Sequence, residues 1–131
     1  MRKPIHDYME FTDLKDMLNK TGEIYGDRPA YVFKTEKKGE FKEITYKQLK
    51  NDIDSLGTAL INLGLEGKRV AVIGENRYEW GVTYLAVVNG TGTIVPLDKA
   101  LPENEIESFI PEEYWNIYAD LKDEKSKKQF E

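Results

Sequence analysis

Cysteine is absent from this sequence of 131 residues, and histidine occurs once, as His6. The absence of cysteine excludes disulfide bonds, thiolate nucleophiles and cysteine-ligated metal. One histidine near a terminus provides neither a catalytic triad nor a metal cluster, so we interpret His6 as a surface residue. No apolar run approaches the ~20 residues that span a bilayer, and residues 1–7 lack the apolar core of a signal peptide. We therefore expect a cytoplasmic protein without a membrane span.

An excess of basic charge is also lacking. The chain has 19 Lys and Arg residues against 24 Asp and Glu residues, which gives a net charge of −5. Because the two signs are interleaved, we expect no general affinity for the nucleic-acid backbone. The hydrophobic share of 40% is that of a globular chain, not a disordered one. The length suits one ordinary domain with one core.

The residue patterns predict an α/β fold with a small mixed, partly parallel sheet, flanking helices and a β-hairpin. Thr12 is expected to cap a first helix, which ends where Gly26 adopts a left-handed conformation. Residues 30–33 and 41–45 are expected to pair as an antiparallel hairpin. Residues 45–48 form a capping box that opens a second helix.

The second half of the chain predicts a strand–helix–strand unit with parallel strands. Residues 69–74 and 93–97 are apolar at consecutive positions, which is typical of strands covered on both faces. Asn76 is expected to cap the helix between them, and residues 102–110 are expected to form a further short helix. Gly57, inside the second helix, indicates close approach of that helix to the sheet.

Four stretches resemble bacterial AMP-forming long-chain acyl-CoA synthetases, which belong to the adenylate-forming ligase superfamily. They are residues 44–46, 67–80, 84–98 and 101–106, and the likeness covers roughly residues 9–110. The resemblance implies part of the N-terminal domain of such a ligase. It also implies a parent reaction in which a fatty acid and ATP give an acyl-adenylate and pyrophosphate, and CoA then displaces AMP. ATP, magnesium and CoA would be the cofactors of that parent enzyme.

The parts of that family that carry its chemistry have no match here. The family's phosphate loop is rich in Ser, Thr and Gly, whereas this chain has only the scattered Ser55, Ser108 and Ser126. The aromatic-Glu motif, the ribose-binding Asp, the hinge and the catalytic Lys are also without a match. We therefore assign no catalytic, cofactor-binding or metal residue. We expect no cofactor for the chain alone, and we predict a truncated, non-catalytic fragment of a fatty acid:CoA ligase.

The tail differs from the body of the chain. Residues 109–117 resemble a short stretch of bacterial type IA DNA topoisomerases, which suggests a fusion or a misassembled reading frame. We therefore divide the chain into a subdomain at residues 1–110 and an unrelated strand-like or hairpin-like tail at residues 111–131. The aromatic side chains of the tail could stack on nucleobases, although we favour packing or an exposed patch. These side chains are Tyr114, Trp115 and Tyr118.

Three glycine-containing turns are candidates for phosphate binding, but in each turn the surrounding sequence disfavours this interpretation. Residues 64–69 lack the Gly and the Ser or Thr of a P-loop at the required positions, so we expect a helix C-cap and a turn. Residues 74–76 lie between a strand and a helix, where an anion could bind, but Glu75 opposes one. Residues 90–92 follow a helix, so we expect a helix stop.

Clustered carboxylates and an aromatic stripe are the remaining candidates. We interpret the carboxylates as solvated faces; they are Glu103, Glu105, Glu107, Glu112 and Glu113. We interpret the stripe, at helical spacing, as core packing; it is Trp80, Tyr84 and Val88.

Three functions stay open: an inactive ligase fragment, a module that pairs with a full-length synthetase, and weak nucleic-acid binding through the tail, which the acidic charge disfavours. We also expect self-association through exposed apolar surface.

Overall fold

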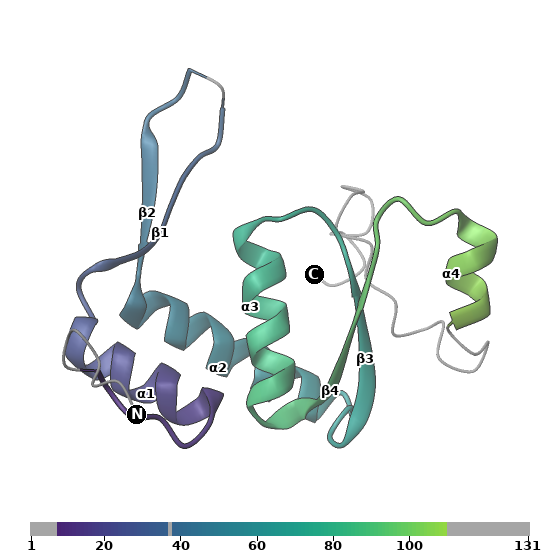
Figure 1. Ribbon diagram of the computed structural model, residues 1–131, viewed down its shortest axis with the longest axis horizontal. Coiled ribbons are helices and arrows are strands. Elements are labelled where there is room, and N and C mark those ends of the chain that lie inside the picture. Colours follow the sequence, from purple (N-terminus) through teal and green to yellow (C-terminus); the bar gives the residue numbers. More distant parts are fainter. Residues whose placement is uncertain (1–7, 37, 110–131) are drawn as a thin grey trace, which may run out of the picture.

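The computed structural model describes residues 8–36 and 38–109. The elements in chain order are α1 (Leu14–Tyr25), β1 (Pro29–Lys34), β2 (Phe41–Thr45), α2 (Tyr46–Asn62), β3 (Lys68–Ile73), α3 (Tyr78–Ala86), the π-helical turn η1 (Val87–Thr91), β4 (Gly92–Leu97) and α4 (Glu103–Phe109). The predicted α/β class is confirmed. Figure 1 shows the β1–β2 hairpin projecting from the α1–α2 pair, and the β3–β4 pair between α3 and α4. None of the helices in the described part of the chain combines the length and apolarity that a membrane crossing requires.

The caps of α1 differ from the prediction. The N-cap is Asp13, whose Oδ1 accepts from the Asp16 amide at 2.7 Å, while the Thr12 amide donates to Asp16 Oδ2 at 3.0 Å. The Asp13 carboxylate is the better acceptor for the positive end of a helix. Gly26 is right-handed, with φ −39° and ψ −48°, so the predicted left-handed cap is wrong. Glycine is needed there for space, because a Cβ would lie 2.8 Å from the Gly22 carbonyl oxygen.

The antiparallel hairpin is confirmed. Tyr31 is opposite Ile44 and Phe33 is opposite Lys42, with an irregularity between Pro29 and Tyr31. The hairpin leads directly into α2. There Thr45 Oγ1 accepts from the Gln48 amide at 3.2 Å, which confirms the predicted cap.

The parallel strand–helix–strand unit is also confirmed. β3 pairs with β4 from Lys68 opposite Gly92 to Ile73 opposite Leu97. The hairpin and this parallel pair are two separate two-stranded sheets. The predicted Asn76 cap is wrong: the N-cap of α3 is Arg77, which makes no side-chain cap hydrogen bond. The backbone of Arg77 is extended, with φ −127° and ψ 169°, so the helix begins one residue later than predicted, at Tyr78.

Two apolar clusters hold these elements together. The larger joins the hairpin, α1, α2 and α3, and its buried members are Leu18, Ile44, Leu49, Ile53, Val82 and Ala86. The smaller joins the loop after α2 to β3 and η1, and its buried members are Leu65, Val70 and Val87. Ile53 is 2% exposed, and truncation of such a residue to alanine costs about 2–5 kcal/mol. Because α2 and α3 contact each other between the two sheets, they couple one cluster to the other.

Candidate functional site

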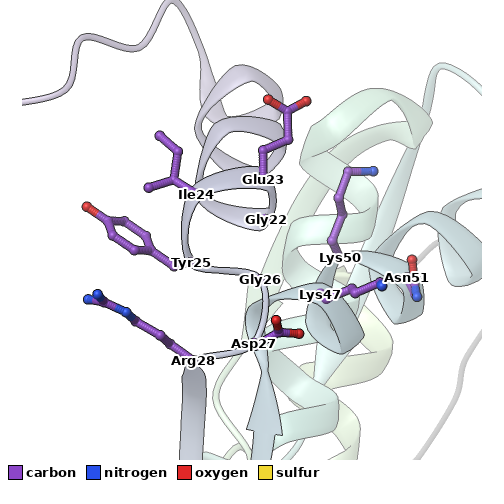
Figure 2. A pocket seen from close by; sticks show the side chains of 10 residues that line it. All are labelled: Gly22, Glu23, Ile24, Tyr25, Gly26, Asp27, Arg28, Lys47, Lys50 and Asn51. Carbon is purple, nitrogen blue, oxygen red and sulfur yellow. The ribbon is translucent and has the colours of Figure 1, made fainter.

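A pocket of about 670 Å³ lies where α1 ends and α2 begins. Its lining residues come from the end of α1, the turn before β1 and the first two turns of α2. They are Gly22, Glu23, Ile24, Tyr25, Gly26, Asp27, Arg28, Lys47, Lys50 and Asn51. Figure 2 shows Tyr25 and Arg28 extending to one side of the turn, with Lys47, Lys50 and Asn51 on the other side. The pocket is therefore polar and open, with cations on both sides.

Two of these cations already have partners within the protein. The Arg28 guanidinium lies 5.4 Å from the centroid of the Tyr25 ring, a cation–π arrangement. The Lys50 ammonium forms an ion pair with Asp54 on the next turn of α2. The carboxylates of Glu23 and Asp27 also line the pocket. This mixture of charges disfavours a dedicated anion site.

The backbone at the start of α2 is occupied as well. The Tyr46 amide donates to the Arg28 carbonyl at 3.1 Å, and the Lys47 amide donates to the Gly26 carbonyl at 3.0 Å. The amide of the next residue is taken by the Thr45 cap. A helix N-terminus binds an anion through its unpaired amides. The pocket wall therefore joins α1 to α2 and does not offer a ready-made phosphate site.

The main polar contact between helices is that of Tyr78 with Asp52. The Tyr78 hydroxyl donates to Asp52 Oδ2 at 2.7 Å, from α3 to α2. Two hairpin aromatics enclose the ring: Tyr31 meets it edge-on at 5.2 Å and Phe33 stacks on it at 6.4 Å. Burial, and then the hydrogen bond to Asp52, raise the pKa of Tyr78 well above its usual value. Such a phenol stays protonated at neutral pH, so it serves as a structural clamp and not as a base.

The turn after α2 is a helix C-cap, as predicted. Gly64 and Gly67 have φ of 80° and 71°, in the left-handed region that favours glycine. The Gly67 amide donates to the Thr91 carbonyl at 2.7 Å. The interpretation of Gly57 is wrong, because its nearest neighbours are the Ala86 carbonyl oxygen and Thr91 Oγ1, at 3.5 and 3.7 Å from a built Cβ. Gly57 therefore faces α3 and η1 and not a sheet.

The other two glycine-containing turns also have roles within the chain. In the loop at 74–76, Glu75 accepts from Lys99 Nζ at 3.0 Å, so the carboxylate meets a cation of the chain itself. The helix stop at residues 90–92 is confirmed, with Gly90 at φ 143°. Thr91 is 1% exposed, and its hydroxyl donates to the Ala86 carbonyl at 3.1 Å. The buried role of Thr91 has no signal in the sequence, where this residue looks like an ordinary turn residue between two glycines.

The remaining candidates lie at the margin of the core or outside the described residues. Trp80 and Tyr84 stack at 5.5 Å. With Val88, they are half-buried and belong to neither buried cluster, so this stripe flanks the core. Glu103 and Glu105 are exposed in the first turn of α4. His6 and the tail residues from 110 onward, with their predicted strand, lie outside the described residues. Within 8–36 and 38–109, no three His, Cys, Asp or Glu side chains gather to hold a metal ion.

The fold, with its hairpin, capped helices and parallel strand pair, resembles part of the N-terminal domain of adenylate-forming enzymes. The sequence model of the family described as "AMP-binding enzyme" matches residues 18–113. The chain belongs to this family.

Two curated relatives and two solved structures illustrate the similarity. Fatty acyl-CoA synthetase A of Dictyostelium discoideum is 38% identical over 75 residues, which are 56% of this chain and 11% of that protein. Medium-chain acyl-CoA ligase ACSF2, mitochondrial, of Mus musculus is 28% identical over 97 residues, 73% of this chain and 15% of that protein. The crystal structure of CmiS6 has a TM-score of 0.65 at 24% identity, over 82% of this chain and 26% of that chain. The N-terminal subdomain of Klebsiella oxytoca NpsA has a TM-score of 0.60 at 26% identity, over 70% of this chain and 23% of that chain.

This chain therefore spans a small part of the proteins that it resembles: 11% and 15% of the two curated relatives and about a quarter of the two solved chains. The family likeness covers most of α1 to α4, so it includes both apolar clusters and the Tyr78–Asp52 contact.

Proposed function

We propose that this chain is a scaffold subdomain of a fatty acid:CoA ligase and that it does not catalyse adenylation on its own. In the parent reaction, a fatty-acid carboxylate attacks the α-phosphorus of ATP, and pyrophosphate leaves. The CoA thiol then attacks the acyl carbon, and AMP leaves. Magnesium, ATP and CoA would bind to the parent enzyme. The observation that carries the fatty-acid assignment is the 38% identity to a curated fatty acyl-CoA synthetase.

The contacts of the described residues support a scaffold role. Two of the three glycine-containing turns make contacts within the chain: the Gly67 amide donates to the Thr91 carbonyl, and the Glu75 carboxylate accepts from Lys99 Nζ. The partly buried pair of Tyr78 and Asp52 joins two helices, and the pKa of the phenol is raised by burial and by this hydrogen bond. These groups fix relative positions of helices and strands, which is what a subdomain contributes to a larger active site.

A segment exchange tests the proposal. Residues 18–109, which lie within the family match, replace the corresponding part of the AMP-binding region of the Dictyostelium fatty acyl-CoA synthetase, and fatty-acid-dependent exchange of labelled pyrophosphate into ATP is measured. We expect the chimera to retain exchange. A matched chimera with Gly92→Val should lose it, because a side chain there meets the Lys68 carbonyl oxygen. A chimera that folds with native thermal stability but shows no exchange, with its ligands saturating, contradicts the proposed role.

Two other roles remain predictions from the sequence. One is pairing with a full-length synthetase, which co-purification would reveal. The other is weak nucleic-acid binding through residues 111–131, which a salt-dependent shift of single-stranded DNA would reveal. Cytoplasmic location also remains a prediction, as do the long-chain specificity and the fused origin of the tail.

A further inference from the structure

The outer face of the hairpin carries four exposed side chains: Val32 and Lys34 on β1, and Phe41 and Glu43 on β2. Val32 is opposite Glu43 and Lys34 is opposite Phe41 in the strand register. Residues two apart on a strand share a face, as do direct cross-strand partners. All four are exposed, with Val32 at 53% and Phe41 at 66% of full exposure. We call this set the outer hairpin face.

The other face of the same hairpin is the one that packs on the body. Its members include Tyr31 and Phe33, which contact the Tyr78 ring, and Ile44, which is buried in the larger cluster. Figure 1 shows the hairpin projecting away from the helices. Two-stranded hairpins are marginal unless their faces are covered. An exposed Phe and Val at diagonal positions on one face of such an element therefore mark a surface for association.

The arrangement of the four side chains is self-complementary. In the grid formed by the register, Lys34 and Glu43 occupy one diagonal, and Val32 and Phe41 occupy the other. We call the line from Val32 to Phe41 the apolar diagonal. A second copy can be placed face to face with the first, related to it by a two-fold axis along this apolar diagonal. Phe41 then meets its own counterpart, and Val32 meets its own. Lys34 faces the partner's Glu43, and Glu43 faces the partner's Lys34.

We propose that two copies of this chain associate through the outer hairpin face in this isologous arrangement. The strands of the two hairpins cross at a steep angle, as in orthogonal sheet packing. The contact satisfies both charges and covers both apolar side chains, as a two-fold interface requires. In the single chain the Lys34 ammonium lies 4.5 Å from the centroid of the Phe41 ring, which keeps the cation beside the apolar diagonal. The small contact area implies a weak, concentration-dependent dimer.

Charge exchange provides the test. Sedimentation equilibrium from micromolar to millimolar concentration is compared for the wild type, K34E, E43K and the double variant K34E/E43K. Each single variant places two like-charged pairs across the interface, so we expect dimerisation to weaken by about tenfold or more. The double variant restores both opposite-charge pairs, so its dissociation constant should return to within about threefold of the wild type. An equimolar mixture of the two single variants should form a heterodimer.

The matched control is K42E, which makes the same charge change on the same hairpin. Lys42 is exposed and opposite Phe33, so it lies on the other face. This variant should dimerise like the wild type. Circular dichroism and thermal unfolding establish that all variants fold. A chain that stays monomeric throughout, a dimer that K34E and E43K leave intact, or a double variant that does not recover would each overturn the proposal.

Discussion

The Tyr78 hydroxyl of α3 donates a 2.7 Å hydrogen bond to the Asp52 carboxylate of α2, across 26 residues of sequence. The same tyrosine ring contacts Tyr31 and Phe33 of the hairpin. One side chain therefore connects α3 to both α2 and the hairpin. If this contact orders the subdomain, its removal should reduce the stability of the fold without unfolding it.

Tyr78→Phe should destabilise the chain by about 1 kcal/mol. The substitution keeps the ring contacts and removes only the hydroxyl, which leaves a half-buried carboxylate without its donor. Urea unfolding provides the measurement. The matched control is Tyr84→Phe, because Tyr84 stacks on Trp80 through its ring. Equal stability of the two variants would show that the Tyr78–Asp52 bond contributes nothing measurable.

The stability of the fold should decrease in alkaline solution because of Tyr78. Its pKa is raised in the folded chain by burial and by Asp52. Its contribution is therefore complete below the ordinary tyrosine pKa of about 10 and is lost as the pH rises beyond it. Comparing unfolding at neutral pH and at roughly pH 11, we expect a smaller alkaline loss for Tyr78→Phe than for the wild type. Parallel losses in the two proteins would contradict the assignment.

Asp16 should make the fold sensitive to acid. The Lys20 ammonium, and then the Thr12 amide, hold the pKa of this carboxylate below its usual value. A depressed pKa contributes stability above the ordinary aspartate pKa of about 3.9, and this stability is lost as the pH falls. Thermal unfolding between neutral and acidic pH should show a shallower decline for Asp16→Asn than for the wild type. Glu79→Gln, a change on α3, is a control for loss of one carboxylate.

Gly92→Ala should be strongly destabilising. A Cβ at this position would lie 2.2 Å from the Lys68 carbonyl oxygen, on the neighbouring strand of the parallel pair. Because backbone must move to relieve the contact, we expect a loss of about 3 kcal/mol in the free energy of unfolding.

Gly57→Ala is the matched change with the opposite expected sign. A Cβ on Gly57 would lie 3.5 Å from the Ala86 carbonyl oxygen and 3.7 Å from Thr91 Oγ1, which are ordinary van der Waals contacts. Alanine is favoured over glycine inside a helix by about 1 kcal/mol. Destabilisation of both variants by the same amount would contradict the assignment of distinct roles to the two glycines.

Gly81→Ala should destabilise the fold, and the additional substitution Tyr31→Phe should recover part of the lost stability. A Cβ on Gly81 would lie 2.6 Å from the Tyr31 hydroxyl oxygen and 3.5 Å from the ring carbon that bears it. Tyr31→Phe removes the hydroxyl, so the double variant should regain about 1–2 kcal/mol relative to Gly81→Ala alone. A double-mutant cycle by urea unfolding measures this coupling. Strictly additive effects would show that the hairpin and α3 do not meet at these residues.

The elements of this fold could be predicted from the sequence because local patterns specify them. The alternating apolar residues of 41–45 predict a strand, and Thr45 with Gln48 predicts a helix start. The continuous apolar runs that became β3 and β4 predict parallel strands. Each of these signals lies within a few residues of the feature that it predicts.

The predictions that were wrong concern features that depend on tertiary contacts. Asn76 has the chemistry of a cap, but α3 starts after Arg77, and its first residue, Tyr78, is hydrogen-bonded to Asp52, which lies 26 residues earlier. Gly57 faces α3 and not a sheet because the two helices pack together, and no local pattern records that contact. The self-complementary outer hairpin face depends on the strand register, which becomes available only with the structure.

The most direct test of the proposed function is fatty-acid-dependent exchange of labelled pyrophosphate into ATP by the purified chain alone, with ATP, magnesium and fatty acids of several lengths. We expect no exchange above a protein-free control, because the contacts of the described residues serve the scaffold. Exchange that co-purifies with the chain and requires a fatty acid would contradict the account and assign an adenylating site to this chain.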